Sequence, residues 1–280
     1  EHRETLVLDI GGTTTDMAVL IRSVPLLDPL GIEMGGTKTP IRALKTRSIG
    51  LGGDSAVRVE GEKISIGPDR VGPAMAYGGA VPTPTDALFV LGRMTDGDAE
   101  AARRGVLSIG DSLGLAAEEA AALVFDRACR IILDEAAQMI ADINSQPVYT
   151  VHELLENHQV RPTEILILGG PAPYFAFRLA ALTDFKVHVV PQWHVANAIG
   201  AALARSTSEV TVFADTERGL CIAPEEDFRQ AVPRDFDKPR AVEVACRLLR
   251  AKHAREGGPD EDIDIEVIED AEFSMVRDFY

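Results

Sequence analysis

The stretch LVLDIGGTTTDMAVL, residues 6–20, sets two adjacent glycines between two short apolar runs. Apolar runs on both sides of a glycine turn are typical of a β-hairpin, so the sequence predicts strands over residues 5–8 and 17–21. The turn also carries Asp9, Asp16 and three consecutive threonines. One interpretation is purely structural, with the Asp and Thr side chains hydrogen-bonding the turn itself.

A second interpretation of the same turn is an anion site. Gly11 and Gly12 lack a Cβ, so their backbone tolerates positive φ and can approach a ligand closely. The N–H groups of such a turn, together with the hydroxyls of Thr13, Thr14 and Thr15, can point at phosphate oxygens. The pattern therefore predicts a phosphate-binding hairpin as the alternative to a structural one.

The two carboxylates of this turn make chemical sense beside a phosphate only if a cation lies between them. Asp9 and Asp16 stand at the two ends of the glycine and threonine run. Magnesium keeps much of its water and takes one or two protein carboxylates together with phosphate oxygens. We therefore expect Asp9 and Asp16 to hold Mg²⁺, through water.

The composition limits the function classes. The 280 residues are 46% hydrophobic, enough for a substantial core, and the formal charge is −16. That charge argues against nucleic acid or an anionic membrane as the main partner. The three cysteines are widely separated, as free thiols in a reducing compartment would be, and no apolar run reaches the roughly 20 residues of a membrane span. We expect a cytoplasmic protein.

Strands and helices alternate through the middle of the chain, which favours an α/β fold. The predicted elements are a hairpin within 49–67, an irregular Gly- and Pro-rich loop over 67–85, a long helix over 115–143, a strand at 165–168, a helix at 174–182, a strand at 187–190 and a helix at 196–204. After residue 206 the pattern changes to paired strands at 210–213 and 219–222, a helix at 239–253 and a strand at 265–268. We therefore expect domains at 1–205 and 206–280, the second a small α+β subdomain.

Two glycine motifs in order resemble a known superfamily. DIGGTTTD (9–16) resembles the second phosphate-binding hairpin of the actin, Hsp70 and sugar-kinase ATPases, and ILILGGPAP (165–173) resembles their adenosine signature. The resemblance implies a ribonuclease H-like actin/Hsp70-type ATPase domain of the α/β class, with inserted hairpins and loops. It implies ATP and Mg²⁺ as cofactors. It also implies a first phosphate hairpin in an upstream domain, which this sequence lacks, so we expect a missing N-terminal domain or partner subunit and an oligomer.

Longer segments narrow the resemblance to the hydantoinase A and oxoprolinase family. They are SIGLGGDSAVRV (48–59), IGPDRVGPAMAYGGAVPTPTDALFVLGRM (66–94), ILGGPAP and the segment VVP…ANAIGAALA. The resemblance implies an ATP-dependent hydrolase that opens cyclic amides such as hydantoin or 5-oxoproline, or an enzyme that carboxylates ketones, by phosphoryl activation of a small substrate's carbonyl. An ATP-driven chaperone or reactivating factor of the same superfamily remains the alternative.

The resemblance also gives roles to residues by position. The implied groups are Asp9 and Asp16 for catalysis and Mg²⁺, Gly11, Gly12, Thr13 and Thr14 for the phosphates, Gly169 and Gly170 for adenosine, and Gly52, Gly53, Asp54, Ser55, Thr85 and Asp86 as substrate-side candidates. For the last group a structural interpretation stays open, in which they are turn and capping residues. In that interpretation Asp86 is the N-cap of a helix over residues 87–94.

Overall fold

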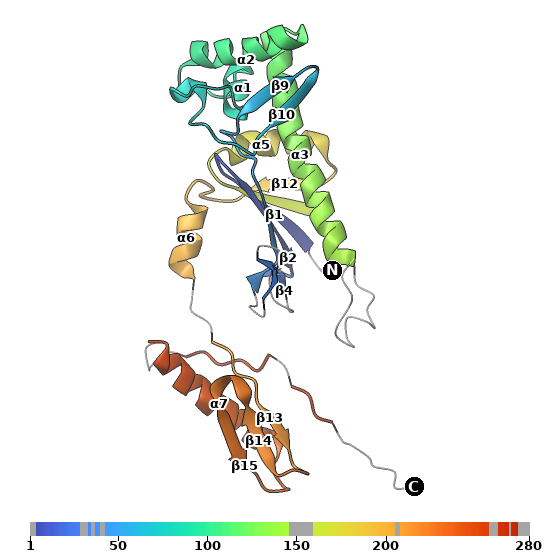
Figure 1. Ribbon diagram of the computed structural model, residues 1–280, viewed down its shortest axis with the longest axis vertical. Helices are drawn as coiled ribbons and strands as arrows, with labels where there is room; N and C mark the ends of the chain where they lie inside the picture. The colour runs from blue at the N-terminus through green and yellow to red at the C-terminus, as the bar shows by residue number, and fades with distance from the viewer. Residues whose placement is uncertain are drawn as a thin grey trace. The chain divides into compact units, whose positions relative to one another are not determined.

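The structure is a computed structural model that describes residues 4–28, 33–34, 37–39, 43–145, 159–204, 208–257, 263–268 and 270–273. The chain divides into two compact units, Glu1–Leu203 and Ala204–Tyr280. Figure 1 shows both units and labels many of their elements. In the described part of the chain, no helix combines the length and apolar character that crossing a bilayer requires.

The first unit is built on a six-stranded mixed sheet with the strand order β12–β11–β1–β2–β3, and β8 also pairs with β2. Its strands are β1 (Glu4–Ile10), β2 (Thr15–Ile21), β3 (Val24–Pro25), β8 (Thr46–Ile49), β11 (Glu164–Leu168) and β12 (Lys186–Val189). β1 pairs antiparallel with β2 and parallel with β11, which in turn pairs parallel with β12. The predicted hairpin over residues 5–21 is confirmed.

One face of this sheet forms the core. Leu6, Leu8 and Ile10 of β1 are fully buried, and so are Ile165 and Ile167 of β11. Their alternation with less buried residues is the period-two pattern of a strand with one face covered. The helices α3 (Ala117–Ser145) and α5 (Ala172–Leu182) pack on the core side, and the long α3 runs past the sheet in Figure 1. The predicted long helix is confirmed.

Three helices pack on one another beside the sheet: α1 (Pro84–Val90), α2 (Ala99–Leu113) and α3. The sequence prediction for α1 was wrong at its start. Thr83, not Asp86, is the N-cap, and Asp86 is the third helical residue of a reciprocal capping box. Helix α2 was not predicted, although Asp98 caps its N-terminus and the left-handed Gly114 ends it.

The remaining elements of the first unit are short. The predicted hairpin near residue 60 is present as β9 (Val57–Glu60) and β10 (Lys63–Ile66), and the irregular segment after it contains one 3-10 turn, η1 (Met75–Tyr77). Two-residue strands form the pairs β4–β7 and β5–β6, at Leu27–Asp28 with Ala43–Leu44 and at Glu33–Met34 with Thr37–Lys38. Helix α6 (Ala196–Leu203) has no buried residue.

The second unit is an antiparallel three-stranded sheet with one helix. Its elements are β13 (Phe213–Asp215), β14 (Leu220–Ala223), η2 (Pro224–Glu226), β15 (Phe228–Ala231) and α7 (Lys238–Arg255). Cys221, Val232 and Val244 form its small core. The first strand lies later than the predicted 210–213, β15 was not predicted, and the strand predicted at 265–268 was wrong because these residues adopt no strand.

Candidate functional site

The two carboxylates of the N-terminal hairpin face each other. Asp9 on β1 and Asp16 on β2 are direct cross-strand partners, on the face of the sheet away from the core. Like charges directly opposite each other destabilise an antiparallel pair, so this arrangement suits a cation held between them. The Oδ2 atom of Asp9 accepts a hydrogen bond of 2.8 Å from the Nδ2 of Asn197, and Thr14 donates over 3.4 Å to Asp16.

The main chain of the hairpin turn points its donors outward. The carbonyl oxygens of Gly11 and Gly12 accept hydrogen bonds from the N–H groups of Gly53 and Asp54, over 2.9 and 2.7 Å. In a trans peptide the C=O and the next N–H point in opposite directions, so the N–H groups of Gly12 and Thr13 point away from Gly53 and Asp54. No described residue accepts a hydrogen bond from either of them. Such free, adjacent N–H groups fit a phosphate oxygen.

A second glycine turn, residues 52–55, packs directly against the first. A Cβ on Gly52 would lie 2.5 Å from the carbonyl oxygen of Gly11, so only glycine permits this approach. The Oγ of Ser55 accepts from the N–H of Gly52 over 2.8 Å. The carbonyl oxygen of Gly53 accepts from both the N–H and the Oγ1 of Thr85, each over 2.8 Å. These buried residues fix the two turns and the start of α1 relative to one another.

Asp54 is the substrate-side candidate whose carboxylate reaches the hairpin tip. Its Oδ2 accepts from Arg70 over 2.8 Å, and its side chain is 17% exposed. Burial raises the pKa of Asp54 above its ordinary value, and the neighbouring Arg70 guanidinium opposes that rise. Arg70 also donates to the Oγ1 of Thr13 over 3.4 Å. One arginine therefore joins the two turns.

Asp86 is fully buried, and its carboxylate is hydrogen-bonded within the protein. It accepts hydrogen bonds from the N–H groups of Met75, Ala76 and Thr83 and from the Oγ1 of Thr83, over 2.8–3.0 Å. These bonds hold the turn at residues 75–77 against the start of α1. A ligand that contacted Asp86 would have to replace them.

The second glycine motif meets the first at one edge of the sheet. Because β1 and β11 are parallel, with Asp9 beside Leu168, the residues after both strands lie together. Gly169 has φ +96°, and a Cβ there would lie 2.1 Å from the carbonyl oxygen of Ile10 and 2.9 Å from the Oδ1 of Asp9. A Cβ on Gly170 would meet no atom within 4 Å. Gly169 therefore serves the close packing of the strands, whereas Gly170 leaves open space.

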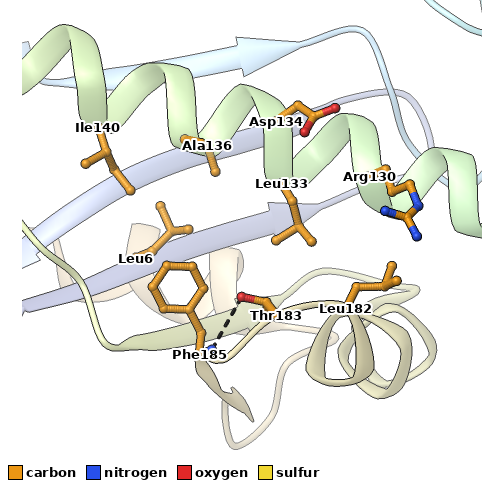
Figure 2. A pocket seen from close by; sticks show the side chains of 10 residues that line it. Leu6, Arg130, Leu133, Asp134, Ala136, Ile140, Leu182, Thr183 and Phe185 are labelled. Atoms are coloured by element: carbon orange, nitrogen blue, oxygen red, sulfur yellow. Dashed lines mark hydrogen bonds between the residues drawn. The ribbon is translucent and has the colours of Figure 1, made fainter.

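The described residues also form a cavity of about 450 Å³ away from these turns. Figure 2 shows it between α3 and the segment that joins α5 to β12, with Leu6, Leu133 and Phe185 among its apolar lining. Arg130 and Asp134 contribute the charged groups. None of the predicted site residues lines this cavity.

Two carboxylates, those of Asp9 and Asp16, are the protein ligands that the site offers to a metal ion. Among the described residues, no group of three or more His, Cys, Asp or Glu is placed to hold a metal ion. Asp9 and Asp16 alone supply two carboxylates, which is the usual protein share for magnesium bound together with phosphates and water. The residues present therefore fit a hydrated Mg²⁺ that arrives with an anionic ligand.

Two residues of this arrangement were missed from the sequence. Asn197 lies 188 positions from Asp9, and Arg70 lies 57 positions from Thr13. Arg70 lies in the segment 66–94 and Asn197 in the small-residue helix Ala196–Leu203, both of which carry the family resemblance, but neither segment indicates which of its side chains reaches the hairpin.

Comparison with known proteins places these motifs in a family. A family model described as hydantoinase/oxoprolinase matches residues 1–210. Among solved structures, a nucleotide-free acetone carboxylase that carries out ATP-dependent acetone carboxylation is 20% identical, with a TM-score of 0.61 over 91% of this chain. An ATP-dependent caprolactamase from Pseudomonas jessenii is also 20% identical, with a TM-score of 0.52 over 78% of this chain.

At this identity the two solved structures show likeness of fold alone. The chain spans only 34% of the acetone carboxylase chain and 33% of the caprolactamase chain. No curated protein matches the sequence. The comparisons thus agree with the observed mixed α/β architecture, on a chain that corresponds to about a third of these two enzymes.

Proposed function

Because the chain belongs to the hydantoinase/oxoprolinase family, we propose that residues 1–205 are the nucleotide-binding part of an enzyme that uses ATP to activate a carbonyl group. The proposed substrates are cyclic amides, opened by hydrolysis as in hydantoin or 5-oxoproline, or ketones that are carboxylated. Transfer of the γ-phosphoryl group of ATP, which releases ADP, would turn the oxygen of a cyclic amide into a phosphate leaving group, and on a ketone it would trap the enolate oxygen as its phosphate. The ATP dependence named for both similar structures supports this proposal.

The observation that carries the proposal is the N-terminal hairpin. It combines free N–H groups at Gly12 and Thr13 with the opposed carboxylates Asp9 and Asp16, so an anion and a cation are accommodated side by side. A bound Mg²⁺ would neutralise charge on the phosphates. In this proposal the N–H groups and the hydroxyls of Thr13 and Thr14 orient the phosphates, and Asn197 holds the Asp9 carboxylate in place.

We propose that the adenosine part of ATP lies beside Gly170 and that the phosphates lie against Gly11 and Gly12. Gly169 packs β11 closely against β1 at the same edge of the sheet. The open space around Gly170 at the shared edge of β1 and β11 supports this position. The strand order, with antiparallel β2 beside the parallel set β1, β11 and β12, supports a ribonuclease H-like ATPase fold. Residues 206–280 are proposed as a separate α+β subdomain.

For the substrate side we propose Asp54 as the residue that reaches the reacting groups. Its partly exposed carboxylate at the hairpin tip supports that role. Gly53, Ser55 and Thr85 would form the frame that positions it, and Asp86 would shape the adjoining loop, because their polar groups are already bonded within the protein. We further propose a cytoplasmic protein whose cleft is completed by a second domain or partner subunit, in an oligomer.

The test is an ATPase assay with a panel of substrates: 5-oxoproline, hydantoin and acetone. It is run on this chain and on the longer protein or complex that supplies the second domain. We expect ADP formation that depends on one of these substrates and is absent from the chain alone. ADP formation that responds to a protein partner and to none of the substrates would contradict the enzyme and support an ATP-driven chaperone.

A further inference from the structure

Arg70 is the cationic side chain that reaches the tip of the N-terminal hairpin. It lies in the irregular loop after β10, and its two terminal nitrogens donate to Asp54 and to the Oγ1 of Thr13. A guanidinium carries five N–H donors in a planar fork, so these two contacts leave donors to spare. The side chain is 43% exposed. Arg70 can therefore take a further acceptor without leaving the site.

The place where Arg70 lies is the place where an anion would arrive. A Cβ on Gly12 would be 2.8 Å from the Oδ2 of Asp54 and 3.9 Å from a terminal nitrogen of Arg70. Gly12 and Thr13 are also the residues with free N–H groups. The guanidinium of Arg70 therefore lies next to the two residues, Gly12 and Thr13, whose N–H groups are free. It is a matching partner for a phosphate, which it can bind through two parallel hydrogen bonds.

The negative charge around the hairpin makes a nearby cation favourable for binding a phosphate. A phosphate at the hairpin would approach Asp9, Asp16 and Asp54 on a chain with a formal charge of −16. Backbone N–H groups and a magnesium ion can offset part of this repulsion. If the guanidinium of Arg70 moves from the Asp54 carboxylate to the phosphate, it places a positive charge directly against the phosphate.

The pair with Asp54 keeps Arg70 ready for that exchange. The backbone of Asp54 is fixed, because its N–H donates to the carbonyl oxygen of Gly12 over 2.7 Å. Its partly buried carboxylate therefore holds the guanidinium above the hairpin. Giving up the Asp54 contact leaves a partly buried carboxylate without its cation, and the charge-assisted contact of Arg70 to phosphate offsets that cost.

We propose that Arg70 is a phosphate-binding residue of this site, exchanging the carboxylate of Asp54 for an oxygen of the triphosphate of a bound nucleotide. Asp54 acts as the positioning residue that holds Arg70 while the site is empty. This inference rests on the proposed function, because it requires that the hairpin binds nucleotide phosphates.

The chain offers a matched control. Arg58 on β9 pairs with Asp69 over the same 2.8 Å and has the same 43% exposure, but it makes no hydrogen bond or ion pair with the described residues 9–16 of the hairpin. Arg58→Gln and Arg70→Gln each remove one positive charge and one ion pair. Thermal unfolding followed by the fluorescence of Trp193, the single tryptophan, checks that both variants fold.

The experiment measures binding of MgATP and of adenosine by ligand-observed NMR titration, on this chain and on the longer protein. We expect Arg70→Gln to weaken ATP binding by about ten- to a hundred-fold, the range for a lost charged hydrogen bond, and Arg58→Gln to change it less than about two-fold. Adenosine binding should be the same in both variants. Asp54→Asn should leave ATP binding equal or tighter, because it removes the competing carboxylate.

Three results would overturn the inference. Equal ATP binding by the Arg70→Gln and Arg58→Gln variants would show that Arg70 does not contact phosphate. A matching loss of ATP binding in Asp54→Asn and Arg70→Gln would show a pair that only supports the loop. No ATP binding by the unsubstituted protein would overturn the proposed function itself, and with it this inference.

Discussion

Gly169→Ala should destabilise the first unit strongly, whereas Gly170→Ala should not. At Gly169 the backbone has φ +96°, a value that costs a residue with a Cβ about 1–2 kcal/mol. The added Cβ would also lie 2.1 Å from the carbonyl oxygen of Ile10, a main-chain atom inside the β1–β11 pair that cannot rotate away. Forced overpacking of this sort costs about 1–3 kcal/mol.

Together these terms predict a loss of about 2–5 kcal/mol in the free energy of unfolding, a large part of the roughly 5–15 kcal/mol of a typical domain. With a urea dependence of about 2–3 kcal/mol per molar, the midpoint should fall by about 1–2 M. At Gly170 the Cβ meets nothing within 4 Å and φ is not positive. Alanine there should be neutral or stabilising by up to about 1 kcal/mol.

Urea unfolding followed by tryptophan fluorescence measures this difference in the right unit. Trp193 is the single tryptophan, and its carbonyl oxygen accepts from the N–H of Gly169 over 3.1 Å. Its signal therefore reports on the first unit without interference from the second. A midpoint for Gly169→Ala within about 0.2 M of the unsubstituted protein, or an equal loss in Gly170→Ala, would refute the packing argument.

Four other outcomes are expected. In the longer protein, Asp9→Asn and Asp16→Asn should abolish ATP turnover but not lower the thermal unfolding temperature, since each removes one of two like charges that face each other across the β1–β2 pair; normal turnover would exclude the magnesium assignment. Gly170→Val should lower the free energy of ATP binding, measured by calorimetry, more than it lowers the free energy of unfolding. Unchanged ATP affinity in a folded variant would exclude the adenosine assignment. The cleft proposed above is completed by a second domain, so the isolated chain should leave the phosphates facing water and bind ATP with a dissociation constant on the order of millimolar or weaker; micromolar binding would contradict this. Burial raises the pKa of the Cys129 thiol from 9.0 to about 12, so the stability that protonated Cys129 contributes below pH 9 should be lost as the pH rises toward 12. At pH 8 a thiol reagent should modify the half-buried Cys246 before Cys129. Equal labelling of the two cysteines would contradict the burial of Cys129.

The elements that were predicted correctly have local causes. The N-terminal hairpin follows from two apolar runs around Gly11 and Gly12, and α3 follows from apolar residues at helical spacing without an internal glycine or proline. Helix α2 was missed because Gly105 and Gly110 interrupt its pattern, yet both pack where a side chain would clash, against Met75 and Leu115. Tertiary packing there overrides the low helix propensity of glycine.

The site was predictable where its residues are neighbours in sequence or belong to the two glycine motifs, which meet at one edge of the sheet. The pairing of Asp9 with Asp16 follows from the symmetry of the turn between them, and the hairpin geometry agrees with it. The contacts of Arg70 with Thr13 and of Asn197 with Asp9 join loops or helices that are far apart in the chain. Such contacts depend on how the loops and the sheet edge meet, which no short motif encodes. The roles of all these residues remain predictions.

The parallel pairing of β1 with β11 has a consequence for how the protein is made. Thr5 pairs with Glu164 and Asp9 with Leu168, so one edge of β1 stays without its partner until most of the first unit has been synthesised. Long-range pairing of this kind slows folding, and an open apolar strand edge can pair with other chains in the meantime. Shortened versions that stop before residue 164 should therefore aggregate, and the hairpin at Gly11 and Gly12 should reach its final geometry among the last parts of the unit.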